Sequence, residues 1–185
     1  MIKQVLAEAE DHMKKSIEVL QSDLQGIRTG RASPALIERL RVEYYGALTK
    51  LVELASIAAP EPQLLTIRPY DPGAMKEIER AILQSDLGLQ PSNDGKLIRL
   101  PIPPLTEERR RELTKVVAKR VEEARVAVRN CRRDSLNDLR ELEKEKLIPE
   151  DEFYVAKDDL QELTDRYVKL VDEIGHAKEQ EIMEI

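Results

Sequence analysis

The sequence has few of the residues on which several common kinds of site depend. Its 185 residues include no tryptophan, one phenylalanine and one cysteine, and aromatic residues make up 3% of the chain. A lone cysteine, Cys131, excludes a disulfide framework and a cysteine-based metal site. So few aromatic residues argue against stacking on unpaired bases and favour long helices over a thick, compact core.

Apolar runs and catalytic motifs are also missing. No run approaches the ~18–20 apolar residues that cross a membrane, and the N-terminus MIKQVLAEAEDHMKK lacks the core of a signal peptide. We therefore expect a soluble, cytoplasmic protein. There is no P-loop, GxGxxG, GxSxG or HExxH motif, and His12 and His176 lie on different predicted helices. We expect no catalytic residue, no metal site and no cofactor, and hence a binding protein rather than an enzyme.

Three segments have the apolar spacing of long helices. They cover residues 2–28, residues 105–146 and the segment after a predicted turn at 147–151. Gly30 is the predicted C-cap of the first, and Thr106 the predicted N-cap of the second. The apolar seams are Ile2, Leu6, Ala9, Met13, Ile17, Leu20, Leu24 and Ile27; then Leu113, Val117, Val121, Ala124, Val128, Cys131, Ser135, Leu139 and Leu142; then Phe153, Ala156, Leu160, Leu163, Tyr167, Leu170, Ile174 and Ala177. Together they predict an elongated, antiparallel three-helix bundle.

Between the first two helices the spacing changes. Residues 36–46, 50–60 and 63–70 are candidate strands, followed by a short helix that Asp71 caps and Gly88 ends. A turn at 92–95 and residues 96–103 complete a hairpin-like unit. The predicted fold class is therefore α+β, with a bundle domain at 1–29 and 105–185 and a small inserted β/α/β domain at 31–104.

Two linkers join these domains and must lie side by side. They contain Gly and Pro, as a hinge requires, and we expect the angle between the domains to change. The predicted hinge residues are Thr29, Gly30, Arg31, Ala32, Ser33 and Pro34 in the first linker (29–34), and Pro101, Ile102, Pro103, Pro104 and Leu105 in the second (101–105).

The main functional signal is the distribution of charge. The formal net charge is −6, yet residues 106–146 carry 13 Lys and Arg against 10 Asp and Glu, while residues 150–185 carry 4 against 12. Beside the second apolar seam, basic residues are sorted onto one face. They are Arg111, Lys115, Arg125, Arg129, Arg132, Arg133 and Arg140. Long helices often carry arginine only for solubility and ion pairs, but such charges usually interleave around the helix.

Arginine forks match the geometry of phosphate, so the sorted face favours a sugar–phosphate backbone as its target. Recognition of structured RNA by shape and phosphate fits better than base stacking. The candidate RNA-binding residues are Arg125, Arg129, Arg132 and Arg133, together with Arg28 and Arg31 at the hinge. Of the neighbouring Tyr44 and Tyr45, a small sheet would bury one and leave the other facing solvent or the domain boundary.

Several motifs, in order along the whole chain, also resemble a known family. They are TGRASPALI at 29–37, VEYYG at 42–46, SDLGL at 85–89, LPIPPLTEERRREL at 100–113 and ARVAVRNCRRD at 124–134. This set closely resembles the bacterial-type ribosome recycling factor, which organelles also use. One departure is Ala47-Leu48-Thr49-Lys50-Leu51, where the family usually has a TPTPL-like segment.

The resemblance implies an L-shaped protein of two domains with roughly the outline of a tRNA. It implies binding to post-termination ribosomes, with the bundle on large-subunit ribosomal RNA. With elongation factor G and GTP, such a factor splits the subunits and releases the ribosome from mRNA. The family's RNA-contacting arginines match Arg129, Arg132 and Arg133 here, and Arg28 and Arg31, near the hinge, also match its pattern. It implies no catalytic site, no cofactor and a monomer.

Two other classes of function stay open from the residues alone. A coiled-coil scaffold or adaptor would use the apolar seams to recruit partner helices, would oligomerise, and would tolerate Arg132→Ala. A hydrolase using surface carboxylates has no spacing that supports it.

Overall fold

A computed structural model of the chain describes residues 1–184. The chain folds into two compact units. The first, which we call the bundle unit, comprises Met1–Leu24 and Thr114–Gln180. The second, the sheet unit, comprises Gln25–Leu113 and the described residues from Glu181 onward. Long helices and a small sheet together make an α+β protein of two units, which confirms the predicted fold class.

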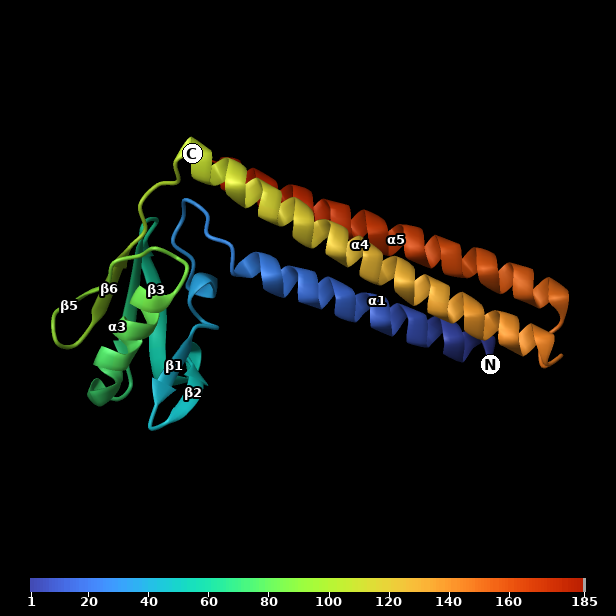
Figure 1. Cartoon of the computed structure of the whole chain (residues 1–185), viewed down its shortest axis with the longest axis horizontal. Helices are drawn as coiled ribbons and strands as arrows, with labels where there is room; N and C mark the ends of the chain where they lie inside the picture. The colour runs from blue at the N-terminus through green and yellow to red at the C-terminus, as the bar shows by residue number, and fades with distance from the viewer. Residues whose placement is uncertain (185) are drawn as a thin grey trace. The chain divides into compact units, whose positions relative to one another are not determined.

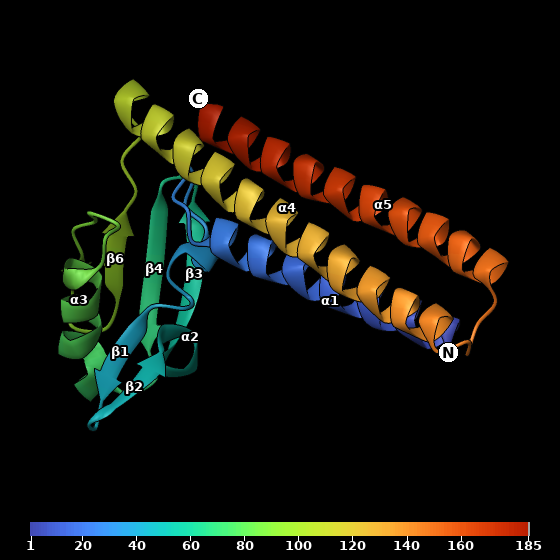
Figure 2. The same ribbon diagram turned by 45° about the vertical axis from the view of Figure 1, so that its right-hand side comes forward.

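The long helices are α1 (Ile2–Gln25), α4 (Glu107–Lys144) and α5 (Glu150–Met183). Within the bundle unit α4 runs antiparallel to α1 and α5 (Figures 1 and 2). The predicted cap of α4 is confirmed, because the Thr106 hydroxyl accepts a hydrogen bond from the Arg109 backbone N–H at 3.1 Å. The predicted C-cap of α1 is wrong, since the helix ends at Gln25 and Gly30 lies in the loop beyond it.

The predicted seams of α1 and α4 form most of the bundle core. The buried seam residues of the bundle unit are Ala9, Met13, Ile17, Leu20 and Leu24 of α1, and Val117, Val121, Ala124, Val128, Ser135 and Leu139 of α4, while the seam residue Leu113 is buried within the sheet unit. These apolar stripes pack against buried residues of α5 such as Leu160 and Tyr167. The seams are therefore used within the chain's own bundle.

The predicted seam of α5 is wrong beyond Tyr167. Val171 is fully buried, whereas the predicted Leu170 is 37% exposed and Ala177 is exposed. A straight helix has 3.6 residues per turn, so an alternation of three and four drifts around a long helix. The core accordingly follows steps of four, through Tyr167, Val171 and the buried Gly175.

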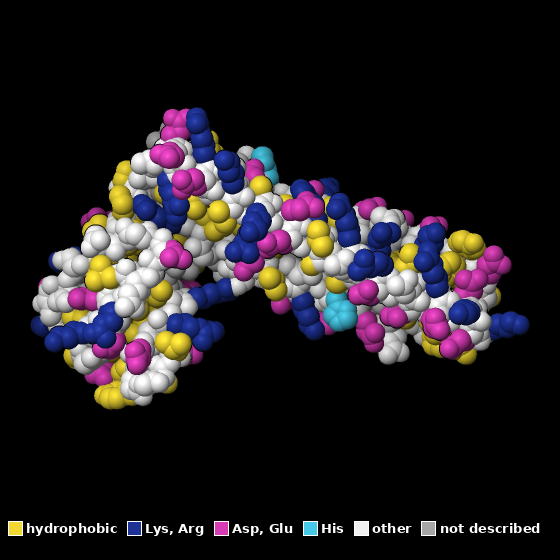
Figure 3. All heavy atoms as spheres, in the orientation of Figure 1, with side chains coloured by type: hydrophobic (Ala, Val, Ile, Leu, Met, Phe, Trp, Pro, Cys, Tyr) yellow, Lys and Arg dark blue, Asp and Glu magenta, His cyan; other side chains and the backbone are white. Residues whose placement is uncertain are grey.

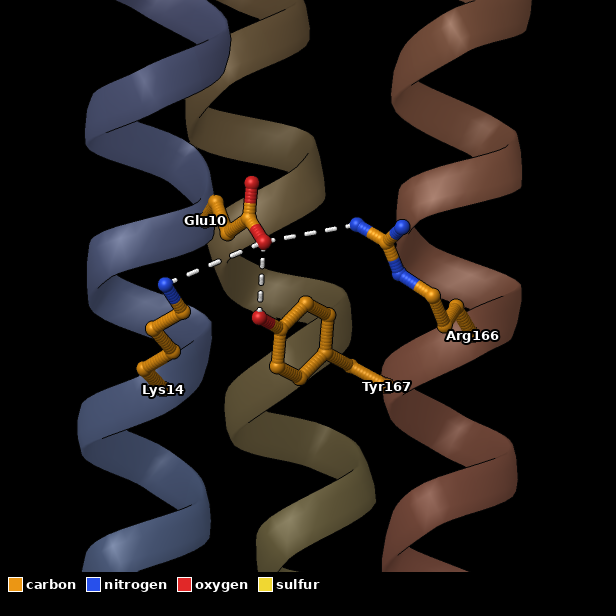
Figure 4. A network of polar contacts seen from close by, with 4 residues as sticks. All are labelled: Glu10, Lys14, Arg166 and Tyr167. Atoms are coloured by element: carbon orange, nitrogen blue, oxygen red, sulfur yellow. Dashed lines mark hydrogen bonds and ion pairs between the residues drawn. The ribbon is translucent and has the colours of Figure 1, made fainter.

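One carboxylate ties α1 to α5 (Figure 4). Glu10 accepts a hydrogen bond from the Tyr167 hydroxyl at 3.0 Å and lies 3.4 Å from the Arg166 guanidinium and 4.0 Å from Lys14 Nζ. Burial, followed by the bond to Glu10, raises the pKa of Tyr167. This contact fixes the register of the two parallel helices.

The sheet unit contains a four-stranded antiparallel sheet and a separate hairpin. The sheet has the order β3-β4-β6-β5, with β3 at Ala55–Glu61, β4 at Leu64–Pro69, β5 at Ser92–Asn93 and β6 at Ile98–Pro101. The hairpin joins β1 (Arg41–Tyr44) to β2 (Ala47–Lys50). Helix α3 (Met75–Gln84) contacts β1 and buries Ile78 and Ile82 in the same core as Leu65 and Leu100.

Three sequence predictions fail here. The strand predicted at 36–46 is a 3-10 turn at Pro34–Leu36 followed by the short β1. The strand predicted at 50–60 begins with one helical turn, α2 (Leu51–Leu54), because a turn places Leu51 and Leu54 on one buried face, whereas a strand would separate them. The helix predicted to reach Gly88 ends at Gln84.

Asp71 caps the 3-10 turn Pro72–Ala74 that leads into α3, whereas the N-cap of α3 itself is Ala74, and the Asp71 contacts make a pH-dependent contribution to stability. Its carboxylate accepts hydrogen bonds from the Gly73 backbone N–H at 2.9 Å and from the Tyr44 hydroxyl at 2.8 Å. The Gly73 bond, then the Tyr44 bond, lowers the pKa of Asp71. This stability is present above the ordinary pKa of an aspartate and is lost as the pH falls through the lower, folded value.

We expect Asp71→Asn to flatten the acid limb of the stability curve. Between pH 5 and pH 2 the wild type should lose more stability than the variant, because the amide does not titrate. Urea midpoints across that range measure the difference. Asp86→Asn is the control, since this exposed carboxylate has no side-chain hydrogen bond to another described residue. An unchanged acid limb in Asp71→Asn would show that its contacts do not stabilise the fold.

Candidate nucleic-acid interface

Four arginines lie within about two turns of α4 in the bundle unit, and we call Arg125, Arg129, Arg132 and Arg133 the arginine surface. The helix places them beside the buried stripe that includes Val128, so the rigid bundle supports their backbone. Figure 3 shows Lys and Arg side chains along the visible side of the bundle, with Asp and Glu between them. The sorting by face is therefore local and does not extend over the whole bundle.

Arg129 and Arg133 are the most available members of the arginine surface. They are four residues apart, so they project from the same side of α4 one turn from each other. Both are exposed, and neither forms a salt bridge or side-chain hydrogen bond with another residue between 1 and 184. Two guanidinium groups one turn apart match the spacing of neighbouring phosphates and lose no internal partner on binding.

Arg132 is partly buried and already oriented. Its Nη1 donates to Gln161 Oε1 on α5 at 3.2 Å, and the Gln161 amide donates in turn to Asp165 at 2.9 Å. The bond fixes one side of the guanidinium and leaves other N–H donors of the fork for a ligand. Arg132 is thus held in place by a second helix.

Arg125 has a different environment. It lies 2.6 Å from Asp172 on α5 and 2.9 Å from Glu122 on α4. The bond to Asp172, followed by the bond to Glu122, raises the pKa of Arg125. A phosphate would have to compete with two carboxylates for this guanidinium. Arg125 therefore contributes more to holding α4 against α5 than its neighbours do.

Cys131 lies between the arginines and is half-buried. Burial raises the pKa of its thiol, so the thiolate needed for nucleophilic chemistry is disfavoured. The predicted role as a small apolar residue fits this environment better than a reactive one.

Arg28 and Arg31 belong to the sheet unit. The Arg28 guanidinium donates to the Pro103 carbonyl, and burial, then the charge of Arg109, lowers the pKa of Arg28. Arg31 forms an ion pair with Glu184 at 3.4 Å, with both side chains largely exposed. Each of these arginines has a partner within its own unit.

The two predicted linkers lie side by side. The Ala32 N–H donates to the Pro62 carbonyl at 2.7 Å, and the Ile102 N–H donates to the Gln63 carbonyl at 2.8 Å. Because Pro62 and Gln63 are consecutive, both linkers run past the same turn between β3 and β4. The bond from Arg28 to Pro103 is a further contact between them.

Sequence reasoning missed the residues of α5 that orient the arginines. Gln161 and Asp172 carry no motif, and only the acidic balance of the third helix hinted at partners for α4. Their role follows from helix packing, which places side chains 29 and 47 residues apart in contact.

Other kinds of site are not found in residues 1–184. They contain no group of three His, Cys, Asp or Glu side chains arranged to hold a metal ion. His12 and His176 are both exposed. In the same residues, no helix is long and apolar enough to cross a membrane.

Comparison with known proteins places this geometry in context. A family model described as ribosome recycling factor matches residues 20–183. The ribosome-recycling factors of Carboxydothermus hydrogenoformans and Roseiflexus castenholzii are 56% and 58% identical to the chain over 185 residues, with both chains fully covered in each comparison.

Two solved structures are also similar. A solution structure of the ribosome recycling factor is 43% identical, with a TM-score of 0.79, over 100% of this chain and 98% of that one. The second comes from models for the T. thermophilus ribosome recycling factor and E. coli elongation factor G bound to the E. coli post-termination complex. It is 47% identical, with a TM-score of 0.70, over the whole of both chains.

Proposed function

The chain belongs to the ribosome recycling factor family, and from this we propose that it holds ribosomal RNA through the arginine surface of α4. The protein is a translation factor that binds post-termination ribosomes and, with elongation factor G and GTP, splits the subunits for recycling. It is not an enzyme, because the hydrolysis of GTP belongs to elongation factor G. We propose that it acts as a monomer in the cytoplasm, where post-termination ribosomes form.

The single observation that carries the site is the pair Arg129 and Arg133. They are exposed, one turn apart and without an ion-pair partner in the described chain, although acidic residues outnumber basic ones overall. Arg132 is held beside them by Gln161. A rigid helix that presents three adjacent guanidinium groups suits phosphates at fixed spacing in folded RNA.

The remaining predicted arginines have smaller roles in this proposal. Arg125 would contact RNA only by giving up part of its bonding to Asp172 and Glu122. Arg31 can exchange its exposed pair with Glu184 for a phosphate at little cost, because such pairs contribute about 0–1 kcal/mol. Arg28 would first have to release the Pro103 carbonyl.

We further propose the domain limits and the hinge predicted from the sequence. The bundle domain then covers 1–29 and 105–185, the inserted domain covers 31–104, and the linkers 29–34 and 101–105 allow their angle to vary. The loop position of Gly30, where an added Cβ would meet no atom within 4 Å, supports freedom in the first linker.

Binding is tested first by co-sedimentation with post-termination ribosomes and with isolated large subunits. We expect the wild type to pellet with both, and the bound fraction to fall steeply with salt because phosphate contacts release counterions. A protein that stays in the supernatant at low salt would contradict the proposed function.

The scaffold alternative has less support. The seams that would recruit partner helices are buried within the chain's own bundle. A scaffold should also oligomerise through those seams, so sizing that shows a monomer, together with ribosome binding, would exclude it.

A further inference from the structure

The loop between β1 and β2 holds a tyrosine in an unfavourable backbone conformation. Tyr44 pairs with Ala47, which leaves a two-residue loop of Tyr45 and Gly46. Their φ angles are +49° and +79°, the positive values of a type I′ turn. Glycine adopts such angles freely, and asparagine or aspartate is the usual first residue. For a tyrosine the left-handed region is strained, because its Cβ crowds the following carbonyl.

The fold does not bury this tyrosine. Tyr45 is 87% exposed, the largest exposed fraction among the exposed large hydrophobic residues of the described chain. Leu48, three residues further along the chain, is 67% exposed. A strained, bulky residue that contributes so little to the core suggests a role outside the fold, since strain of this kind collects at binding sites.

The Tyr45 ring also packs against a tyrosine that is itself fixed by hydrogen bonding. Its ring lies edge-to-face on Tyr44, with centroids 4.5 Å apart and planes at 72°. The Tyr44 hydroxyl donates to Asp71, which is itself fixed by the Gly73 backbone N–H. This chain of contacts limits the motion of the Tyr45 ring, so little side-chain entropy remains to be lost on binding.

The surroundings favour a protein surface over RNA. A shallow hollow beside the ring is lined by Glu43, Gly73, Glu77 and Arg80. Glu77 pairs with Arg80 at 3.4 Å, while Glu43 has no ion pair or side-chain hydrogen bond with another described residue. The unpaired carboxylate beside the ring repels phosphate and attracts a cationic or N–H donor group. Tyrosine is one of the residues enriched among those that anchor protein interfaces.

We propose that Tyr45 is an anchor residue for elongation factor G, inserted into an apolar pocket on that protein while Glu43 accepts a donor at the rim. The proposal rests on the proposed function, which requires the two factors to act together on the ribosome. It assigns the β1–β2 loop of the sheet unit a protein contact, distinct from the RNA contact of the arginine surface in the bundle unit.

The test is Tyr45→Asn in the full chain. The variant should be more stable than the wild type but less active with elongation factor G. We expect the melting temperature to rise by a few degrees, because asparagine suits the positive φ. We expect the concentration of elongation factor G that gives half-maximal splitting of post-termination ribosomes to rise about 10- to 30-fold, as when an interface anchor is truncated. Light scattering follows the splitting, and affinity for isolated large subunits should not change.

Matched variants separate the explanations. Tyr70→Asn removes a tyrosine that is 70% exposed in the same unit and should leave the requirement for elongation factor G unchanged. Tyr45→Phe keeps the ring and should retain most of the activity. If Tyr45→Asn splits ribosomes normally at the concentrations of elongation factor G that suffice for the wild type, Tyr45 is not an anchor. The proposed function would stand in that case. Weaker binding of Tyr45→Asn to large subunits without elongation factor G would overturn it in favour of a ribosomal contact. Failure of the wild type to split ribosomes would instead overturn the proposed function.

Discussion

Replacing Arg133 by alanine should weaken binding to large ribosomal subunits about tenfold, and Arg129→Ala/Arg133→Ala about a hundredfold. Each guanidinium is free in the described chain, so its loss removes a charge-assisted contact without breaking an internal one. Each lost phosphate contact should also reduce the slope of log affinity against log salt by about one unit. Equilibrium binding over a salt series measures both quantities.

Arg120→Ala is the matched control for this prediction. It removes the same charge from the same helix, but Arg120 is paired with Glu123 at 3.1 Å. We expect its affinity to stay within about twofold of wild type, since a single distant charge is screened at physiological salt. If Arg120→Ala and Arg133→Ala weakened binding equally, net charge would explain the effect and the arginine surface would be wrong.

Gly175→Val should cause a large loss of stability in the bundle unit. Gly175 is buried on α5, where an added Cβ would overlap Cγ2 of Val121 on α4. A β-branched valine has little freedom to rotate away within a helix, so the two helices would have to separate. We expect a loss of about 2–3 kcal/mol, and a fall in melting temperature of about 5–10 °C.

A double-mutant cycle with Val121→Ala tests the cause. Shortening Val121 makes room for the new side chain, so Gly175→Val/Val121→Ala should be more stable than the sum of the single effects predicts. Strictly additive losses would mean that the contact between Gly175 and Val121 does not limit the helix spacing. Chemical denaturation with a constant m-value gives the three differences.

The sequence was most informative where structure follows from periodic spacing. The seams of α1 and α4 placed Met13, Val117 and Val128 in the core, and the same spacing grouped the arginines on one side of α4. The sequence was least informative where tertiary packing decides between two local geometries. The segment containing Leu51 and Leu54 was predicted to be part of a strand, but its two leucines are buried together, which selects a helical turn.

The arginines of the candidate site could be identified from the sequence, but their relative importance could not. Arg125 and Arg129 are neighbours on a helical wheel, yet Asp172 binds the first and no residue of the described chain pairs with the second. Helix spacing alone does not give the axial register of α5 against α4, which determines that difference. For Tyr44 and Tyr45 the sequence predicted one sheltered and one exposed ring. It did not predict the positive φ of Tyr45, which distinguishes this exposed tyrosine as a candidate binding residue.

The most direct test of the central claim is the breakdown of post-termination ribosomes with elongation factor G and GTP. Wild type and Arg129→Ala/Arg133→Ala are compared at equal concentration, below saturation of the wild type. We predict rapid splitting by the wild type, dependent on both elongation factor G and GTP, and little splitting by the double variant until its concentration is raised about a hundredfold. Equal rates for the two proteins would contradict the arginine surface as the site that holds ribosomal RNA.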